Sequence, residues 1–213
     1  MSIKINLNIF LFAILFFFTS QFEIYALTMI FALMHELGHL VCGIILGFQV
    51  KCLNIMPLGF SVEFYTNIDD YNVKIKKSNL IVLKKLLIDF AGPFVNIFII
   101  MISIIMGFST NFVYANLIIL IVNLIPIYPL DGGRILRNFF KLFFSTKKAY
   151  SYTNKISNIF FCVISIILSI SVLYFKNIAI FFAFFFICIL ILCDNKRYNT
   201  YRKIYEKIEL EDN

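Results

Sequence analysis

Long apolar runs are the feature that most constrains the fold of this 213-residue chain. Apolar residues make up 61% of the sequence and charged residues only 15%, whereas soluble globular domains hold about 45–50% and about 25%. Because a helix needs roughly 20 apolar residues to cross a bilayer, the runs predict an all-α polytopic membrane protein with about six transmembrane helices. The expected spans are residues 6–22, 25–47, 82–107, 112–128, 157–175 and 177–193.

These spans predict one membrane-embedded domain over residues 1–193, followed by a short charged tail over residues 194–213. We expect the tail to be a surface helix or a disordered end. The first run follows Lys4 and has no small-x-small cleavage site, so it is interpreted as a retained span and not as a secretory signal. The five cysteines show no C-x-x-C spacing and predict neither a disulfide framework nor a cysteine metal site.

The positions of the basic residues predict the orientation. With six spans and a cytoplasmic N-terminus, every one of the 19 Lys and Arg residues except Lys176 falls on one side. Because Lys and Arg accumulate in cytoplasmic loops, both termini are expected in the cytoplasm. The net charge of +7 is then explained by basic residues that lie on the cytoplasmic side next to anionic lipid headgroups. No nucleic-acid partner is therefore predicted.

The cytoplasmic stretch between Phe48 and Thr66 alternates loosely between apolar and polar residues around Pro57-Leu58-Gly59. This pattern predicts a short membrane-associated β-hairpin. Such a hairpin can add an edge strand to an extended peptide, or it can simply cap the membrane domain. The sequence leaves both alternatives open.

The only two histidines, His35 and His39, stand four positions apart with Glu36 between them, in the string H-E-x-x-H. A segment inside a span must be helical, so both imidazoles lie on one face, one turn apart. This spacing suits a single Zn²⁺ held by two neutral imidazoles, with Glu36 beside it as general base. Ionisable groups inside a membrane are costly and indicate a functional site.

A catalytic zinc ion usually takes three protein ligands and keeps one position open. Asp131 is the candidate for the third ligand, because two prolines and two glycines break the helix around it. Broken backbone at membrane depth is tolerated where it lines protein or a cavity. The alternative is that Asp131-Gly132-Gly133 forms only a cytoplasmic turn.

Three motifs, in this order, resemble the site-2 protease family of intramembrane zinc metalloproteases (peptidase family M50). They are H-E-L-G-H at 35–39, A-G-P-F-V-N at 91–96, and the segment from Asn123 to D-G-G-R at 131–134. The resemblance covers a core of about residues 25–140. It implies one Zn²⁺ per chain, bound by His35, His39 and Asp131, with Glu36 as the catalytic residue.

The resemblance also implies roles for three other residues. Asn123 and Pro129 are expected to hold the unwound segment or the substrate backbone near the metal, and Asn96 is expected to line the site. For Gly92, Pro93 and Asn96 the alternative is close helix packing with a kink.

Within the family, the order of the elements resembles the sporulation branch, the stage IV sporulation protein FB type. One span precedes the H-E-x-x-H span, a hairpin follows it, and two spans follow Asp131. That branch implies cleavage of the pro-sequence of the sigma factor K precursor, inhibitory membrane protein partners and a place in the membrane around the forespore. The active site is expected to open to the cytoplasm. The chain carries no CBS domain, so nucleotide control is not expected, and the absence of a PDZ-sized insertion argues against the branch that processes anti-sigma factors.

Three alternative functions are open at this stage. A site-2-type protease can act on another membrane-bound regulator. A metal transporter would need further ionisable residues along a path through the bilayer, and the spans hold few beyond the motif residues and Asp89. An inactive homologue would bind a partner without cleaving it, but Glu36 and the three expected ligands are all present.

Overall fold

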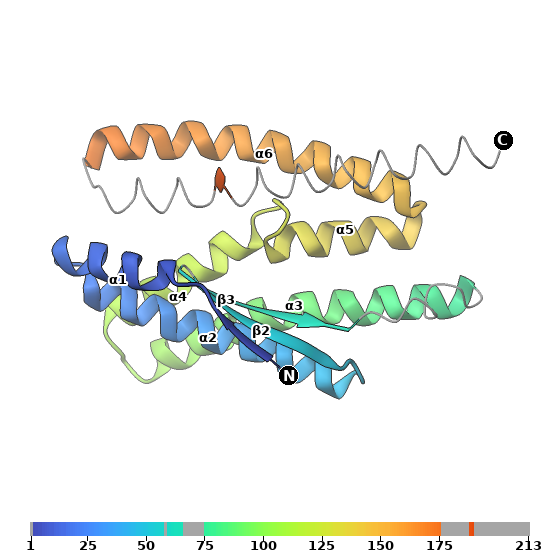
Figure 1. The fold of residues 1–213 in the computed structure, drawn as a ribbon, viewed down its shortest axis with the longest axis horizontal. Helices are drawn as coiled ribbons and strands as arrows, with labels where there is room; N and C mark the ends of the chain where they lie inside the picture. Colours follow the sequence, from blue (N-terminus) through green and yellow to red (C-terminus); the bar gives the residue numbers. More distant parts are fainter. Residues whose placement is uncertain (1, 58, 66–74, 176–187, 190–213) are drawn as a thin grey trace.

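The computed structural model describes residues 2–57, 59–65, 75–175 and 188–189 (Figure 1). In this part of the chain the fold is mostly helical with one small sheet. Most of the span expected over 177–193, and the whole tail over 194–213, fall outside the described residues.

The helices lie mainly along the long axis of the molecule (Figure 1). They are α1 (Asn8–Phe18), α2 (Phe22–Ile45), α3 (Ile75–Ile105), α4 (Thr110–Leu124), α5 (Asp131–Phe143) and α6 (Thr146–Phe175). Three described segments are long and apolar enough to cross a membrane, namely Phe22–Ile45, Asn79–Ile105 and Thr146–Ser171. The structure therefore supports a multipass membrane protein, while the number of six spans and the cytoplasmic termini stay predictions.

Polar side chains lie inside the molecule and large apolar ones lie on its surface. The side chains of Phe18, Ile45 and Ile105 are largely exposed. By contrast, Asn96, Asn116 and nine other polar or charged residues of the described part of the chain are buried. Soluble proteins rarely expose so much contiguous apolar surface, whereas lipid tails can cover it. This distribution fits the membrane-embedded domain that the sequence predicts.

The span expected at 112–128 is wrong in its C-terminal part, because α4 ends at Leu124. Its 15 residues reach about 22 Å, which is shorter than the roughly 30 Å of a hydrocarbon core. The chain bends over residues 125–130 near the middle of the molecule, and α5 continues toward the far end of the bundle (Figure 1). Pro126 and Pro129 lie in this bend, where a missing N–H breaks no helical hydrogen bond.

The sequence did not predict helix α5. Two glycines in its first turn allow the backbone of the bend to lie directly against the start of this helix. A Cβ on Gly132 would collide with the carbonyl groups of Leu124 and Ile125. A Cβ on Gly133 would collide with the backbone of the bend at residues 127–128. The bend therefore folds directly over the start of α5, and Asp131 is the first residue of that helix.

The sheet contains the expected hairpin and one strand that was not expected. Strands β2 (Val50–Met56) and β3 (Gly59–Phe64) pair in antiparallel fashion. Strand β1 (Ser2–Ile5) pairs with β2 in parallel, giving the order β1-β2-β3. A run of four residues is too short for periodicity to identify, and the parallel pairing joins segments about 50 positions apart in the chain.

The hairpin packs along α2, a position that the sequence did not specify. The Tyr25 hydroxyl donates a hydrogen bond to the Pro57 carbonyl at 2.9 Å, so the turn lies beside the first part of α2. Farther along, the Phe64 ring lies over Gly43, where a Cβ would collide with it. Strand β3 therefore runs beside α2 at the level of the H-E-x-x-H motif.

Candidate metal centre

Helix α2 presents the three polar residues of its motif to the interior. His35, Glu36 and His39 are buried, while Leu37 and Val41 between and after them are exposed. A helical repeat of 3.6 residues places the two histidines on the same face, as the sequence predicted. The segment thus keeps apolar side chains toward lipid and directs its ionisable groups toward α3, α5 and β3.

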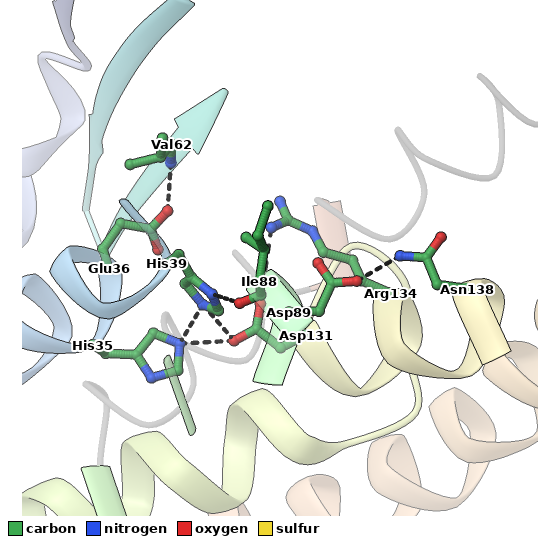
Figure 2. A network of polar contacts seen from close by, with 9 residues as sticks. All are labelled: His35, Glu36, His39, Val62, Ile88, Asp89, Asp131, Arg134 and Asn138. Carbon is green, nitrogen blue, oxygen red and sulfur yellow. Dashed lines mark hydrogen bonds and ion pairs between the residues drawn. The ribbon is translucent and has the colours of Figure 1, made fainter. Parts of the chain in front are cut away.

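Asp131 joins the two histidines from the start of α5 (Figure 2). Its Oδ2 atom lies 2.7 Å from Nε2 of His35 and 3.0 Å from Nε2 of His39. The two Nε2 atoms are 3.1 Å apart. Among the described residues, these three are the only group of His, Cys, Asp or Glu side chains arranged to hold a metal ion.

The chemistry of these atoms fits a cation between them. His39 Nδ1 lies 2.6 Å from the carbonyl oxygen of Ile88, so in the neutral ring Nδ1 carries the proton and Nε2 presents a lone pair. That lone pair faces a carboxylate oxygen and the Nε2 of His35. A metal ion shared by these atoms would satisfy them together. A ligating histidine is commonly oriented by a hydrogen bond from its other ring nitrogen to a backbone carbonyl, and the Ile88 carbonyl does this for His39. Two imidazoles and one carboxylate suit Zn²⁺.

Gly92 on α3 lies directly against both imidazoles. A Cβ at this position would overlap Nε2 of His39 and Nε2 of His35. The sequence offered only close helix packing as the role of Gly92, whereas the structure adds that the ligand rings occupy the space of its missing side chain.

Further polar contacts hold Asp131 and its helix in place. Arg134 Nη1 lies 3.8 Å from Asp131 Oδ1, on the side of the carboxylate that faces away from the histidines. Asn138 Nδ2 donates a 2.6 Å hydrogen bond to Asp89 Oδ2, which ties α5 to α3 (Figure 2). Asp89 follows Ile88, so two successive residues of α3 support His39 on α2 and the helix that carries Asp131.

Glu36 points away from the three ligand atoms toward strand β3 (Figure 2). Its Oε1 accepts a hydrogen bond from the backbone N–H of Val62. In the β2–β3 ladder Val62 lies opposite Leu53, and its N–H is directed to Glu36 instead of to β2. The outer edge of β3 and the expected general base are therefore in direct contact.

The three weaker site candidates lie on three different segments, namely α3, α4 and the bend. Asn96 is fully buried on α3, one turn beyond Gly92, and both atoms of its side-chain amide lack a hydrogen-bond partner in the part of the chain that the structure describes. The backbone carbonyl oxygen of Asn96 accepts a hydrogen bond from the side-chain amide of Asn116. Asn123 is half-buried near the end of α4, and Pro129 lies in the bend. Their roles stay predictions.

Some of the contacting groups could not be recognised in the sequence. The carbonyl of Ile88 carries no side-chain signal. Asn138 and Asp89 are 49 positions apart and meet only in the folded chain. The single available signal was the spacing of Asp131, Arg134 and Asn138 at i, i+3 and i+7, which places them along one side of a helix.

Comparisons with known proteins agree with this picture. Residues 109–168 match the family model of Peptidase family M50. The chain is 29% identical over 144 residues to stage IV sporulation protein FB of Bacillus subtilis (strain 168). That match covers 64% of this chain and 46% of the relative, so the chain spans about half the length of that protein.

The fold is also similar to a solved structure, the site-2 protease from Methanocaldococcus jannaschii. The TM-score is 0.60 with 22% sequence identity, over 86% of this chain and 87% of that one. The resemblance to the site-2 protease family, first indicated by three sequence motifs, is confirmed by these comparisons.

We predict that Gly92→Ala weakens zinc binding, because the new methyl group displaces the imidazoles from their common point. Supporting groups around a metal typically contribute about 10- to 100-fold in affinity, and the loss should lie in that range. Competition with a fluorescent chelator would measure it on the purified protein. Phe94→Ala, at an exposed position of the same helix, is the matched control, and equal zinc affinity in both variants would contradict this role of Gly92.

We further predict that Asn138→Leu lowers zinc affinity by about tenfold, because Asp89 loses its donor and α5 is held less firmly against α3. The double exchange Asp89→Asn with Asn138→Asp restores one amide and one carboxylate at the contact and should recover most of the loss. The same chelator titration measures all three proteins. No recovery in the double exchange would show that the hydrogen bond is not what positions Asp131.

Proposed function

We propose that this chain is an intramembrane zinc metalloendopeptidase of the site-2 protease type, which hydrolyses a peptide bond of a membrane-associated protein. The observation that carries the proposal is the convergence of His35, His39 and Asp131 from two helices onto one buried point next to Glu36. The family match and the similar fold support the same reaction class.

Each residue of the cluster has a definite task in this reaction. When bound, Zn²⁺ lowers the pKa of a water molecule and polarises the scissile carbonyl. Glu36 takes a proton from the attacking water at a carboxylate oxygen and delivers it to the leaving amine nitrogen. The Val62 N–H orients the Glu36 carboxylate. Asn123 is proposed as a hydrogen-bond donor to the oxyanion, and Pro129 and Asn96 are proposed to shape the site around the substrate backbone.

The outer edge of β3 is the proposed docking position for an extended substrate. On an edge strand, the backbone N–H and C=O groups of every second residue point outward. The Val62 N–H points outward, so the backbone N–H and C=O groups of Phe60 and Phe64 point to the same side. A substrate strand added there would lie beside Glu36, and its main chain would supply the affinity. A helical substrate has its own backbone groups paired, so it must unwind before it can bind in this way.

The proposed substrate is the sigma factor K precursor, whose pro-sequence would be removed at a site open to the cytoplasm. Support comes from the similarity to stage IV sporulation protein FB, which covers about half of that protein. In a sporulating bacterium the enzyme would then lie in the membrane around the forespore, with inhibitory membrane proteins as partners. A different membrane-bound regulator is the alternative substrate.

We expect wild-type protein to shorten a tagged sigma factor K precursor in co-expression, and Glu36→Gln to lose this activity by at least about 100-fold, because general base catalysis is removed. A gel that separates precursor from product measures the conversion. Glu36→Gln should still bind zinc stoichiometrically, since His35, His39 and Asp131 are unchanged, whereas His39→Ala should lose zinc.

The outcomes separate the enzyme from its substrate. Cleavage that persists in Glu36→Gln would reject the mechanism. If the wild type binds zinc but leaves the precursor intact, the proposed substrate is wrong, and cleavage of an unrelated membrane-anchored peptide would then test the protease activity by itself.

We predict that Phe60→Pro weakens substrate binding, because proline removes one outward N–H from β3. One hydrogen bond contributes about 1 kcal/mol, so KM for a cleaved peptide should rise about fivefold. Phe60→Ala loses the same ring but keeps the N–H, and it serves as the control. Equal KM values for the two variants would show that the β3 backbone does not bind the substrate.

A further inference from the structure

Two cationic side chains of α5 pack on aromatic rings at a place that has no part in the proposed reaction. The guanidinium carbon of Arg137 lies 3.3 Å from the ring centre of Tyr128 and 4.5 Å from that of Tyr150. One turn later, Lys141 Nζ lies 4.9 Å from the ring centre of Tyr150. Arg137 and Lys141 are i and i+4 on the helix, so both side chains occupy one face.

Neither Arg137 nor Lys141 forms an ion pair with the residues that the structure describes. Nε of Arg137 is buried and makes no hydrogen bond to them. The carboxylate that acts on Lys141 is Asp89, which is already hydrogen-bonded to Asn138. Burial and the positive charges of Arg137 and Lys85 lower the pKa of Lys141 to about 8. Cations that are partly removed from water without a counter-ion are costly, so an anion bound between them would be strongly stabilising.

A cluster of three aromatic rings, two of them exposed, adjoins the cation pair. The ring of Phe144 lies 6.1 Å from that of Phe140 and 5.4 Å from that of Tyr152, and Phe140 and Tyr152 are 6.0 Å apart. Phe144 and Tyr152 are more than 40% exposed. Phe140 lies one turn after Arg137 on α5, and Phe144 is the first residue after the helix, so the rings and the cations are neighbours in the C-terminal half of α5.

The rings belong to the second half of α5, the residue after it and the first part of α6, at the same end of the bundle as the start of α3 (Figure 1). Arg137 connects this region to the bend, because it contacts both Tyr150 and Tyr128. Lys85 of α3, whose charge acts on Lys141, and Lys147 and Lys148 at the start of α6 add positive charge there. Basic residues and exposed aromatic rings at the ends of apolar helices are typical of the interface between lipid and water. The ligand at this place is therefore expected to have both an anionic and an apolar part.

We propose that Arg137 and Lys141 bind the phosphate of an anionic phospholipid headgroup, and that the rings of Phe140, Phe144 and Tyr152 lie along its acyl chains. The planar guanidinium offers paired N–H donors to phosphate oxygens, and the ammonium of Lys141 adds a second charge on the same side. Tyr128 belongs to the bend before Asp131, so a bound lipid would also hold Arg137 against the segment that carries the third metal ligand.

The test uses the full chain purified in mild detergent and measures retained lipid by native mass spectrometry. The anionic probe is phosphatidylglycerol, and phosphatidylcholine is the neutral comparison. We expect wild type to retain phosphatidylglycerol preferentially, and Arg137→Gln with Lys141→Gln to bind it at least about tenfold more weakly, since each cation near an anionic headgroup contributes about 1 kcal/mol. Lys4→Gln with Lys155→Gln removes the same charge from exposed positions on β1 and α6 and should change binding little.

Several outcomes would overturn the proposal. Equal retention of both lipids by wild type would do so, as would equal losses in the two double variants. Displacement of phosphatidylglycerol by millimolar inorganic phosphate, with phosphate itself bound, would identify a soluble anion as the ligand. Zinc stoichiometry and circular dichroism check that each variant is folded, and if Arg137→Gln unfolds the chain, Lys141→Gln alone is expected to weaken phosphatidylglycerol binding by about fivefold.

Discussion

The contact of one Asp131 oxygen with both imidazoles is the interaction on which the rest of the structure depends. It requires three polar side chains to meet inside a molecule whose surface is apolar, where an unpaired polar group costs several kilocalories per mole. Helix α3 makes this meeting possible because it packs against both α2 and α5. Gly92 leaves room for the rings, the Ile88 carbonyl orients His39, and Asp89 holds α5 through Asn138.

The bend between α4 and α5 gives one short helix two separate tasks. At its first residue, α5 presents Asp131 to the histidines at the centre of the molecule. In its second half, the same helix carries Arg137 and Lys141, the cations of the proposed lipid site. The bend itself is pinned to α6, because Ser157 donates a hydrogen bond to the Pro126 carbonyl at 3.1 Å and lies 3.3 Å from the Tyr128 nitrogen. A lipid bound at Arg137 would therefore contact the same bend that positions the metal ligand Asp131.

Sequence periodicity was sufficient for features that depend on near neighbours in the chain. The spacing of His35 and His39 required a common helical face, and the alternation after Phe48 indicated the β2–β3 hairpin. Periodicity could not find β1, because four residues give too few repeats. It also could not say where the hairpin packs, because that position depends on tertiary contacts such as the hydrogen bond from Tyr25 to Pro57.

The sequence by itself determined that the chain is apolar enough for a membrane, that α2 carries a pair of possible metal ligands with Glu36 between them, and that the helix must break near Asp131. These properties follow from composition, the 3.6-residue repeat and the geometry of proline and glycine. Only the tertiary structure decided that Asp131 reaches the histidines, that Gly92 makes space for them and that β3 contacts Glu36. Those contacts join residues from 26 to 96 positions apart, and a local pattern holds no information about which distant groups will meet.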